Sequence, residues 1–300
     1  MDAVRIAILG PTASGKSALA VEVARRLGGT VVNGDPFQAL LRLPIGTGQP
    51  TAAERGGVPH VGYGVLPLET RLNAQDFGSQ VRQWMSPLPA AVLVTGSGLY
   101  LRGIWEQLDA LPDVPVALVA RVRAWGERLG APALHRFLAA VDPLRAGQLH
   151  PNDSGRIQRA LALHLATGGR ASSLMTGVSR ELPAGWRAVV VLPSREVLRK
   201  RVRRRVRAMV EAGWAQEVQR VVAEGHGEDL RRLRPLGYLD WLAGGPPREI
   251  EARIVQATQA YAKRQDTWFR GQLPGIPRWD PDTEPLEDAL TALGLPSPSA

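Results

Sequence analysis

The stretch "ILGPTASGKSALA" (residues 8–20) decides the fold, because it joins the end of an apolar run to the start of a helical pattern. Its glycines, lysine and serine fit the spacing G-x-x-x-x-G-K-[ST], in which backbone N–H groups and the lysine hold phosphate oxygens. The motif has this meaning where a strand precedes it and a helix follows, and both patterns are present here. The phosphate- or diphosphate-binding residues that we expect are Gly10, Thr12, Ala13, Ser14, Gly15, Lys16 and Ser17.

Three further apolar runs resemble the one at residues 4–9, since they are rich in β-branched residues and bounded by glycine or proline. They cover residues 30–34, 90–96 and 187–193. Helical patterns at 16–27 and 76–85 separate the first three runs. This alternation predicts an α/β fold, a P-loop-type parallel sheet flanked by helices, with the ligand at the carboxyl ends of the strands.

Helical periodicity replaces the strand pattern between the third and fourth runs. We therefore expect a helical, basic insertion domain at 112–186 within a catalytic core made of 1–111 and 187–294. The final residues, 295–300, are expected to form a disordered tail.

Residues 195–223 predict one long helix, because Leu198, Val202 and Val206 fall on a single apolar stripe. The run "RKRVRRRVR" (199–207) occupies the remaining faces. It is either a solvated helix face or a phosphate-binding surface, and the sequence leaves both interpretations open.

The formal net charge of +9 at pH 7 favours an anionic partner such as nucleic acid. Among the 37 lysines and arginines only Lys16, Lys200 and Lys263 are lysines, a skew typical of genomic base composition, which weakens the argument. The absence of cysteine excludes disulfides and thiolate metal sites. Without a long apolar run or a signal-peptide pattern, we expect a cytoplasmic protein with no membrane partner, and we expect a monomer.

The strand-end carboxylate that holds Mg²⁺ in ordinary P-loop ATPases is missing from "AAVLVTGSGLY" (90–100). Asp35, which follows the second strand run, places a carboxylate at the same edge of the sheet. It could bind Mg²⁺, act as a base, or merely cap a turn before Pro36.

Nine short blocks occur along the chain in an order that is typical of one enzyme family. They are "GPTASGKS" (10–17), Asp35 with Gln38, "IGTGQP" (45–50), "VPH" (58–60), "DF" (76–77), "GSGLYL" (96–101), "HPND" (150–153) with "RIQRAL" (156–161), "LGY" (236–238) and "YAKRQDTWFR" (261–270). In these blocks the chain resembles the tRNA dimethylallyltransferases, also called tRNA isopentenyltransferases, over about nine tenths of its length.

The resemblance implies transfer of a five-carbon prenyl group from dimethylallyl diphosphate to N6 of adenine 37 in tRNA, with Mg²⁺ as cofactor. The phosphate loop would then hold the donor's diphosphate, and Ser17 would bind Mg²⁺. The family's catalytic aspartate matches Asp35 as proton acceptor. Ser97 stands where the family has threonine and is the second catalytic residue implied, with a hydroxyl that would orient the adenine or a diphosphate oxygen.

The tRNA partner would be bound in two regions. The resemblance places Asp35, Pro36, Phe37, Gln38 and Ser97 near the extruded adenine. It places Arg121, Arg156, Gln158 and Arg159 of the insertion on the anticodon stem-loop. Lys263 and Arg264 are further candidates for contacts with anionic groups.

Five further positions depart from the family pattern, and the effect of these substitutions on activity is not apparent from the sequence. They are Pro36, Leu40, Gln49, Ala162 and Gln259.

Two other functions remain open at this point. A P-loop small-molecule or nucleotide kinase would have the same loop, sheet and helical lid but would prefer ATP. A non-catalytic RNA-binding protein could keep the scaffold without the transfer. A zinc site is not indicated, because the five histidines lack ligand-like spacing.

Overall fold

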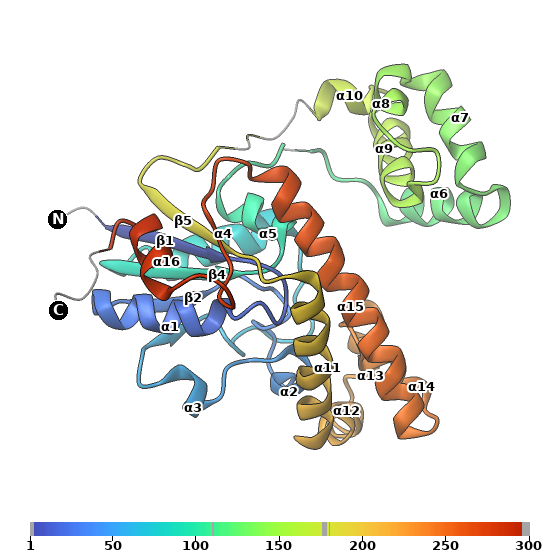
Figure 1. Cartoon of the computed structure of the whole chain (residues 1–300). Helices are drawn as coiled ribbons and strands as arrows, with labels where there is room; N and C mark the ends of the chain where they lie inside the picture. The colour runs from blue at the N-terminus through green and yellow to red at the C-terminus, as the bar shows by residue number, and fades with distance from the viewer. Residues whose placement is uncertain (1–2, 110, 176–178, 180, 296–300) are drawn as a thin grey trace. The chain divides into compact units, whose positions relative to one another are not determined.

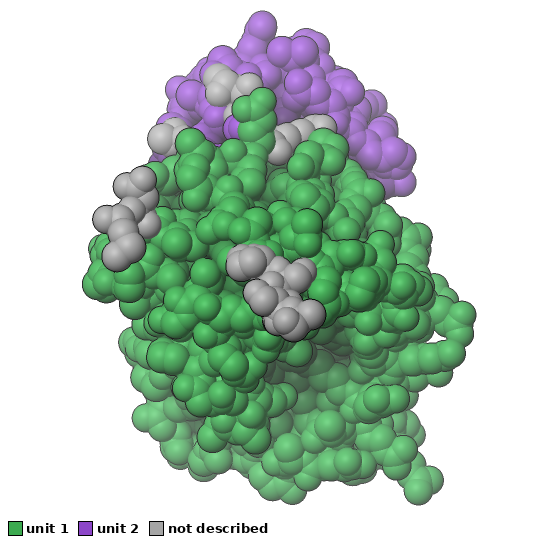
Figure 2. Space-filling model, turned by 60° about the vertical axis from the view of Figure 1, so that its left-hand side comes forward, with its two compact units in different colours: residues 1–106, 180–300 green, residues 107–179 purple. Residues whose placement is uncertain are grey.

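The computed structural model describes residues 3–109, 111–175, 179 and 181–295. The chain divides into two compact units, which Figure 2 shows in different colours. Unit 1 comprises residues 1–106 and 180–300, and unit 2 comprises residues 107–179. Unit 2 overlaps the insertion expected at 112–186 but begins and ends a few residues earlier. None of the described helices combines the length and apolar character that crossing a bilayer requires.

The described part of unit 1 is built on a six-stranded parallel sheet with the strand order β3-β2-β4-β1-β5-β6 (Figure 1). Ile8 of β1 pairs with Val94 of β4 on one side and Val189 of β5 on the other. The predicted α/β fold is confirmed, and two edge strands of two residues each were too short for the sequence pattern to reveal. The strands are β1 (Val4–Leu9), β2 (Thr30–Asn33), β3 (His60–Val61), β4 (Ala90–Thr95), β5 (Trp186–Val191) and β6 (Arg278–Trp279).

Helices cover both faces of this sheet (Figure 1). Ile6 and Ile8 face α1 (Lys16–Leu27) and α16 (Leu286–Ala292). Ala7 and Leu9 face α4 (Ala74–Met85), α5 (Gly98–Ile104) and the last turns of α15 (Pro247–Gln272). Because successive side chains of a strand point to opposite faces, a sheet buried on both sides needs the near-continuous apolar runs seen in the sequence.

A further set of helices in unit 1 packs around α15 and has an apolar core of its own. Here α11 (Arg195–Glu211) lies beside α15, as Figure 1 shows. The single helix predicted over 195–223 is wrong, because the chain breaks before α12 (Trp214–Ala223). Gly213 has a φ of 97° at the break, a left-handed conformation that few other residues tolerate. The break turns Trp214 into the core, where its side chain is 1% exposed.

Unit 2 is all-helical in its described residues, with a core around Val122, Leu134, Leu138 and Ile157. Buried Asp142 joins two of its helices, because its carboxylate accepts hydrogen bonds from the backbone N–H groups of Arg145 and Ser172. Its helices are α6 (Val116–Leu129), α7 (Ala131–Val141), α8 (Pro143–Gly147), α9 (Ser154–Thr167) and α10 (Ala171–Leu174).

The C-terminal segment packs against unit 1 up to its last described residue. Leu295, which we expected in a disordered tail, is 8% exposed in the core beside α16, so this part of the prediction is wrong. The remainder of that expected tail, 296–300, lies outside the described residues. Shorter helices complete unit 1, namely α2 (Pro44–Thr47), α3 (Ala52–Arg55), α13 (Gly227–Leu233) and α14 (Tyr238–Ala243).

Candidate active site

The phosphate loop lies between β1 and α1, where the motif predicts it. Gly15 has a φ of 100° as the N-cap of α1, a conformation that glycine adopts without strain. A Cβ at Gly10 would lie 2.5 Å from the carbonyl oxygen of Val191 in β5, so this close approach also requires glycine. The Lys16 ammonium donates to the carbonyl oxygen of Pro11 at 3.2 Å and therefore folds back over the loop.

Gln265 of α15 fixes the loop through both ends of its side-chain amide. Its Oε1 accepts from the backbone N–H of Thr12 at 2.9 Å, and its Nε2 donates to the carbonyl oxygen of Gly96 at 2.7 Å. Arg201 of α11 donates to the carbonyl oxygen of Ser14 at 2.9 Å. The position of the loop therefore depends on two helices from the C-terminal third of the chain.

Asp35 follows β2 and is held by Asn33, the last residue of that strand. The Asp35 N–H donates to Asn33 Oδ1, and Asn33 Nδ2 donates to the carbonyl oxygens of Asp35 and Gly62, each at 2.8 Å. One carboxylate oxygen of Asp35 accepts from the N–H of Phe37 at 3.0 Å. Asp35 thus has the turn-capping role that the sequence left open, and it also lines the pocket described below.

The end of β4 carries hydroxyl groups in place of a carboxylate. The buried Thr95 hydroxyl donates to the carbonyl oxygen of Gly34 at 2.7 Å and accepts from the N–H of Ser97 at 3.1 Å. Ser97 is the N-cap of α5, but its hydroxyl makes no capping hydrogen bond. Thr95 therefore ties the strand end to the turn that carries Asp35.

These segments enclose a cavity of about 290 Å³ in unit 1. Six predicted site residues line it, namely Thr12, Lys16, Ser17, Asp35, Phe37 and Gln38. Predicted residues that do not line it are Gly10, Ala13, Ser14, Gly15, Pro36, Ser97, Lys263 and Arg264. Lining residues that sequence reasoning missed include Thr95, Gly96, Arg205, Met209, Trp214, Tyr238, Tyr261 and Gln265.

The position of Arg205 in the basic run is a signal that could have identified it as a pocket residue. It follows Arg201 by one helical turn, and both arginines are half-buried beside the apolar stripe, whereas Arg203 and Arg204 are exposed. Arg205 enters the pocket, so the solvated-face interpretation holds for part of the run but not for this residue.

The charged groups in the pocket shift one another's pKa. Burial raises the pKa of the Asp35 carboxyl, although the hydrogen bond from Phe37 and the positive charges of Lys16 and Arg205 oppose this. Burial and the charge of Arg205 lower the pKa of Lys16 to about 8, although Asp35 opposes them. Burial also lowers the pKa of Arg205. The pocket thus combines two cationic groups with a carboxyl that is more basic than an exposed aspartate.

The charge of Asp35 also affects three tyrosines, Tyr63, Tyr100 and Tyr261. Burial, followed by the negative charge of Asp35, raises the pKa of Tyr100 to about 12 and raises those of Tyr63 and Tyr261 further. All three phenols therefore stay protonated near neutral pH.

The predicted stem-loop residues lie in unit 2. Arg156 and Arg159 are exposed on one face of α9, whereas Gln158 is half-buried. Arg121 is exposed on α6, with its guanidinium 5.4 Å from the ring centre of Trp125. Lys263 and Arg264 are exposed on α15 of unit 1.

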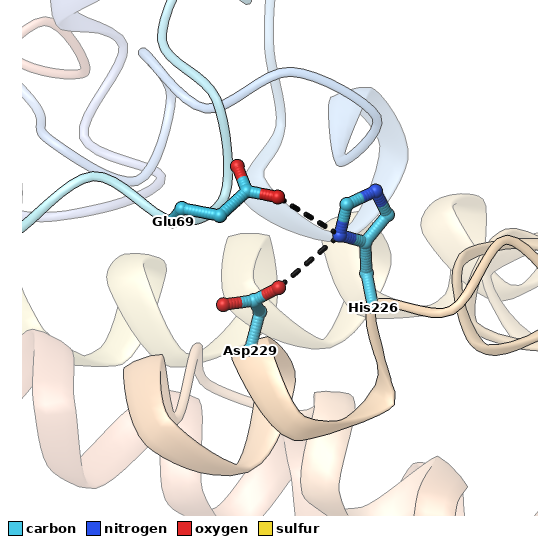
Figure 3. A group of neighbouring side chains, drawn as sticks. All are labelled: Glu69, His226 and Asp229. Carbon is cyan, nitrogen blue, oxygen red and sulfur yellow. Dashed lines mark hydrogen bonds and ion pairs between the residues drawn. The ribbon is translucent and has the colours of Figure 1, made fainter.

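A histidine and two carboxylates lie together outside the pocket lining (Figure 3). His226 Nδ1 is 3.4 Å from Glu69 Oε1 and 3.1 Å from Asp229 Oδ2. Arg232 pairs with the other oxygen of Asp229 at 2.9 Å, and the Glu69 side chain is 61% exposed. These contacts account for the arrangement as a link between α13 and the segment after β3, so we assign the cluster a structural role.

Two family models match the chain. The model described as isopentenyl transferase matches residues 4–61, and the one described as IPP transferase matches residues 40–272. The chain belongs to the IPP transferase family. The resemblance that the nine blocks indicated is therefore confirmed, and those blocks lie along the full extent of the two matches.

Individual relatives agree with the family. The tRNA dimethylallyltransferase of Rhodospirillum centenum is 40% identical over 293 residues, which cover 94% of this chain and 93% of the relative. The crystal structure of the tRNA isopentenylpyrophosphate transferase of Bacillus halodurans matches with a TM-score of 0.66 at 28% sequence identity. The match covers 97% of this chain and 94% of that protein. A eukaryotic dimethylallyltransferase whose structure was solved acting on tRNA shares the fold, with a TM-score of 0.75 at 22% identity. The match covers 99% of this chain and 81% of that protein.

Proposed function

We propose that this member of the IPP transferase family transfers the dimethylallyl group of dimethylallyl diphosphate to N6 of adenine 37 in tRNA. The observation that carries the proposal is a single pocket in which the phosphate-loop lysine, Lys16, and the carboxyl of Asp35 both line the cavity. Curated relatives with 36–40% identity are tRNA dimethylallyltransferases, which favours prenyl transfer over the kinase alternative.

Asp35 would accept the proton of the attacking amine. The lone pair of adenine N6 is delocalised into the ring, so the amine becomes a good nucleophile only as it loses a proton. A carboxylate whose pKa is raised by burial takes that proton more readily than an exposed aspartate. The hydrogen bond from the Phe37 N–H fixes one carboxylate oxygen and so orients the other.

Lys16 and Arg205 would stabilise the leaving group. Negative charge builds on the diphosphate as its bond to the allylic carbon breaks, and cationic groups in a poorly solvated pocket stabilise such charge strongly. Both side chains line the cavity, and α1 begins at Lys16, so the positive end of its dipole lies at the pocket.

The loop residues fit Mg²⁺. Mg²⁺ prefers oxygen ligands, and Ser17 presents a hydroxyl at the pocket lining. Ser14 Oγ is buried without a hydrogen-bond partner among the described residues, so the loop holds a polar atom that protein contacts leave unused. We propose that Ser17 and the diphosphate oxygens hold the ion, which would supply positive charge to the leaving group.

The tRNA would contact residues in both units. An adenine stacked in an anticodon loop must be extruded to reach an enclosed pocket. Phe37 and Gln38 line that pocket and would contact the base. Ser97, at the start of α5, and Pro36, next to Asp35, would contact the same nucleotide from outside the lining. We propose that Arg121, Arg156, Gln158 and Arg159 bind the anticodon stem-loop, with Lys263 and Arg264 as further phosphate contacts.

The test is incubation of the purified protein with unmodified tRNA, dimethylallyl diphosphate and Mg²⁺, followed by mass analysis of the nucleosides. We expect the adenosine at position 37 to gain one five-carbon prenyl unit. A thermal shift separates the kinase alternative, because dimethylallyl diphosphate should raise the Tm more than ATP does. Equal or greater protection by ATP, with no prenylated nucleoside, would contradict the proposal.

A further inference from the structure

Glu217 of α12 is a buried carboxylate that the proposed chemistry does not use. The residue is 1% exposed, and its carboxylate accepts three hydrogen bonds. The donors are the N–H of Ile45 at 2.7 Å, the N–H of Gly46 at 3.0 Å and the hydroxyl of Tyr238 at 2.6 Å. A charged acceptor with this set of donors fixes the first turn of α2 firmly.

The other end of α2 holds the side chain of Gln38. Gln38 Nε2 donates to the carbonyl oxygens of Thr47 at 3.1 Å and Gly48 at 2.9 Å. Both hydrogens of the amide group are thereby used, so the atom left for a ligand is Oε1, which is an acceptor. Glu217 and Gln38 are thus joined through the backbone of one short helix.

Packing allows α2 little freedom to move. A Cβ at Gly46 would lie 2.0 Å from Trp214 Nε1, and one at Gly48 would lie 2.0 Å from the Arg205 guanidinium. The backbone of α2 therefore presses directly on side chains that line the pocket. A displacement of its first turn would be passed to the Thr47 and Gly48 carbonyls and to Gln38.

We propose that Glu217 is a positioning residue for base recognition, which acts by holding α2 so that Gln38 offers only an acceptor to the base. An acceptor at this place favours a base with an amine at C6, as in adenine, over one with a carbonyl there, as in hypoxanthine. The inference rests on the proposed function, because it assumes that the extruded base contacts Gln38.

The experiment compares the binding of two anticodon stem-loops, with adenine or hypoxanthine at position 37, in the presence of a non-reactive thio analogue of dimethylallyl diphosphate. We expect the wild-type protein to prefer adenine about tenfold, because one hydrogen bond is replaced by a repulsive contact. In Glu217→Gln the new amide group meets a backbone N–H donor, and we expect the preference to fall to about twofold.

Two readouts separate positioning from a general loss of structure. The Kd for the diphosphate analogue should stay within about twofold in Glu217→Gln, because the phosphate loop is held by Gln265 and Arg201 instead. Glu224→Gln, the same change at a partly exposed residue at the end of α12, should leave both measurements unchanged. If Glu217→Gln does not fold, Tyr238→Phe removes one of the three donors and should lower the preference by about half.

The outcomes distinguish the inference from the proposed function. A folded Glu217→Gln that keeps the tenfold preference overturns the role of Glu217, and so does an equal loss of stem-loop and diphosphate binding. A wild-type protein with no preference and no prenyl transfer overturns the proposed function together with the inference.

Discussion

Asp35 uses different atoms for two tasks. Its backbone and one carboxylate oxygen belong to a turn fixed by Asn33 and Phe37, and the turn sets the direction of the second oxygen. Lys16 and Arg205 are the positive charges that lower its pKa against the effect of burial. A residue that is rigid, half-buried and close to cations is well suited to accept one proton beside a bound anion.

Asp35→Asn should separate catalysis from binding. Asparagine keeps an acceptor for the Phe37 N–H but cannot take a proton, so we expect kcat to fall by at least about a hundredfold. The Kd for tRNA should remain within about twofold, as measured by filter binding. Retention of more than about a tenth of the wild-type single-turnover rate would exclude Asp35 as the proton acceptor.

The pH profile should be bell-shaped. Asp35 is ionised only above its raised pKa, so the transfer rate falls as the pH falls through that value. Lys16 is charged below a pKa of about 8, so binding of the diphosphate weakens as the pH rises through about 8. We expect kcat/KM for dimethylallyl diphosphate to report both limbs.

Lys16→Arg provides the control for that profile, because an arginine stays charged to higher pH. In this variant the alkaline limb of the profile should move to higher pH, whatever the change in absolute rate. An alkaline limb that stays near 8 would show that another group is responsible.

At the scale of single elements, the sequence predicted those helices and strands that a local residue pattern defines. The four inner strands and α1 followed from apolar runs and the glycine-rich loop between them. The break at Gly213 was missed because the apolar stripe continues in register on both sides of it. The two-residue edge strands were missed because their pairing partners alone define them.

The close packing of α2 leads to a stability prediction. Gly46→Ala would place a methyl group 2.0 Å from Trp214, and such overpacking costs about 1–3 kcal/mol of unfolding free energy. Urea denaturation measures the difference. Gly271→Ala is the matched control in α15, where a Cβ meets nothing within 4 Å, and it should be neutral or slightly stabilising.

An unchanged midpoint in Gly46→Ala would mean that α2 moves freely. That result would weaken the case for a rigid connection from Glu217 to Gln38.

At the scale of the whole molecule, the site is assembled from segments that no local pattern connects. The sequence motifs located Lys16, Ser17, Asp35 and Gln38, all within the first forty residues. Much of the remaining lining comes from α2, from the end of β4 and from the helices α11, α12, α14 and α15, whose contribution depends on how the helices pack. The monomeric state and the tRNA contacts of unit 2 stay predictions.

The contribution of unit 2 can be measured through salt dependence. Arg156→Ala with Arg159→Ala removes two exposed charges from α9 and leaves its buried face intact. We expect weaker tRNA binding and a slope of log K against log salt that is smaller by about one to two units. The Kd for dimethylallyl diphosphate should not change, since every residue that lines the proposed donor pocket belongs to unit 1.

If the slope of log K against log salt equals that of the wild-type protein, these two arginines do not contact tRNA phosphates.

The hydrogen bonds that join Gln265 to Thr12 and Gly96 have a consequence for biosynthesis. The motif at residues 10–17 is synthesised long before Gln265, which accepts the hydrogen bond of the Thr12 N–H and lies 253 residues further along the chain. A nascent chain lacking α15 holds neither Gln265 nor Tyr261, so the pocket around Lys16 and Asp35 stays incomplete. Affinity for the proposed prenyl donor should therefore arise only after α15 has been synthesised, and a chain truncated before α15 should not bind that donor.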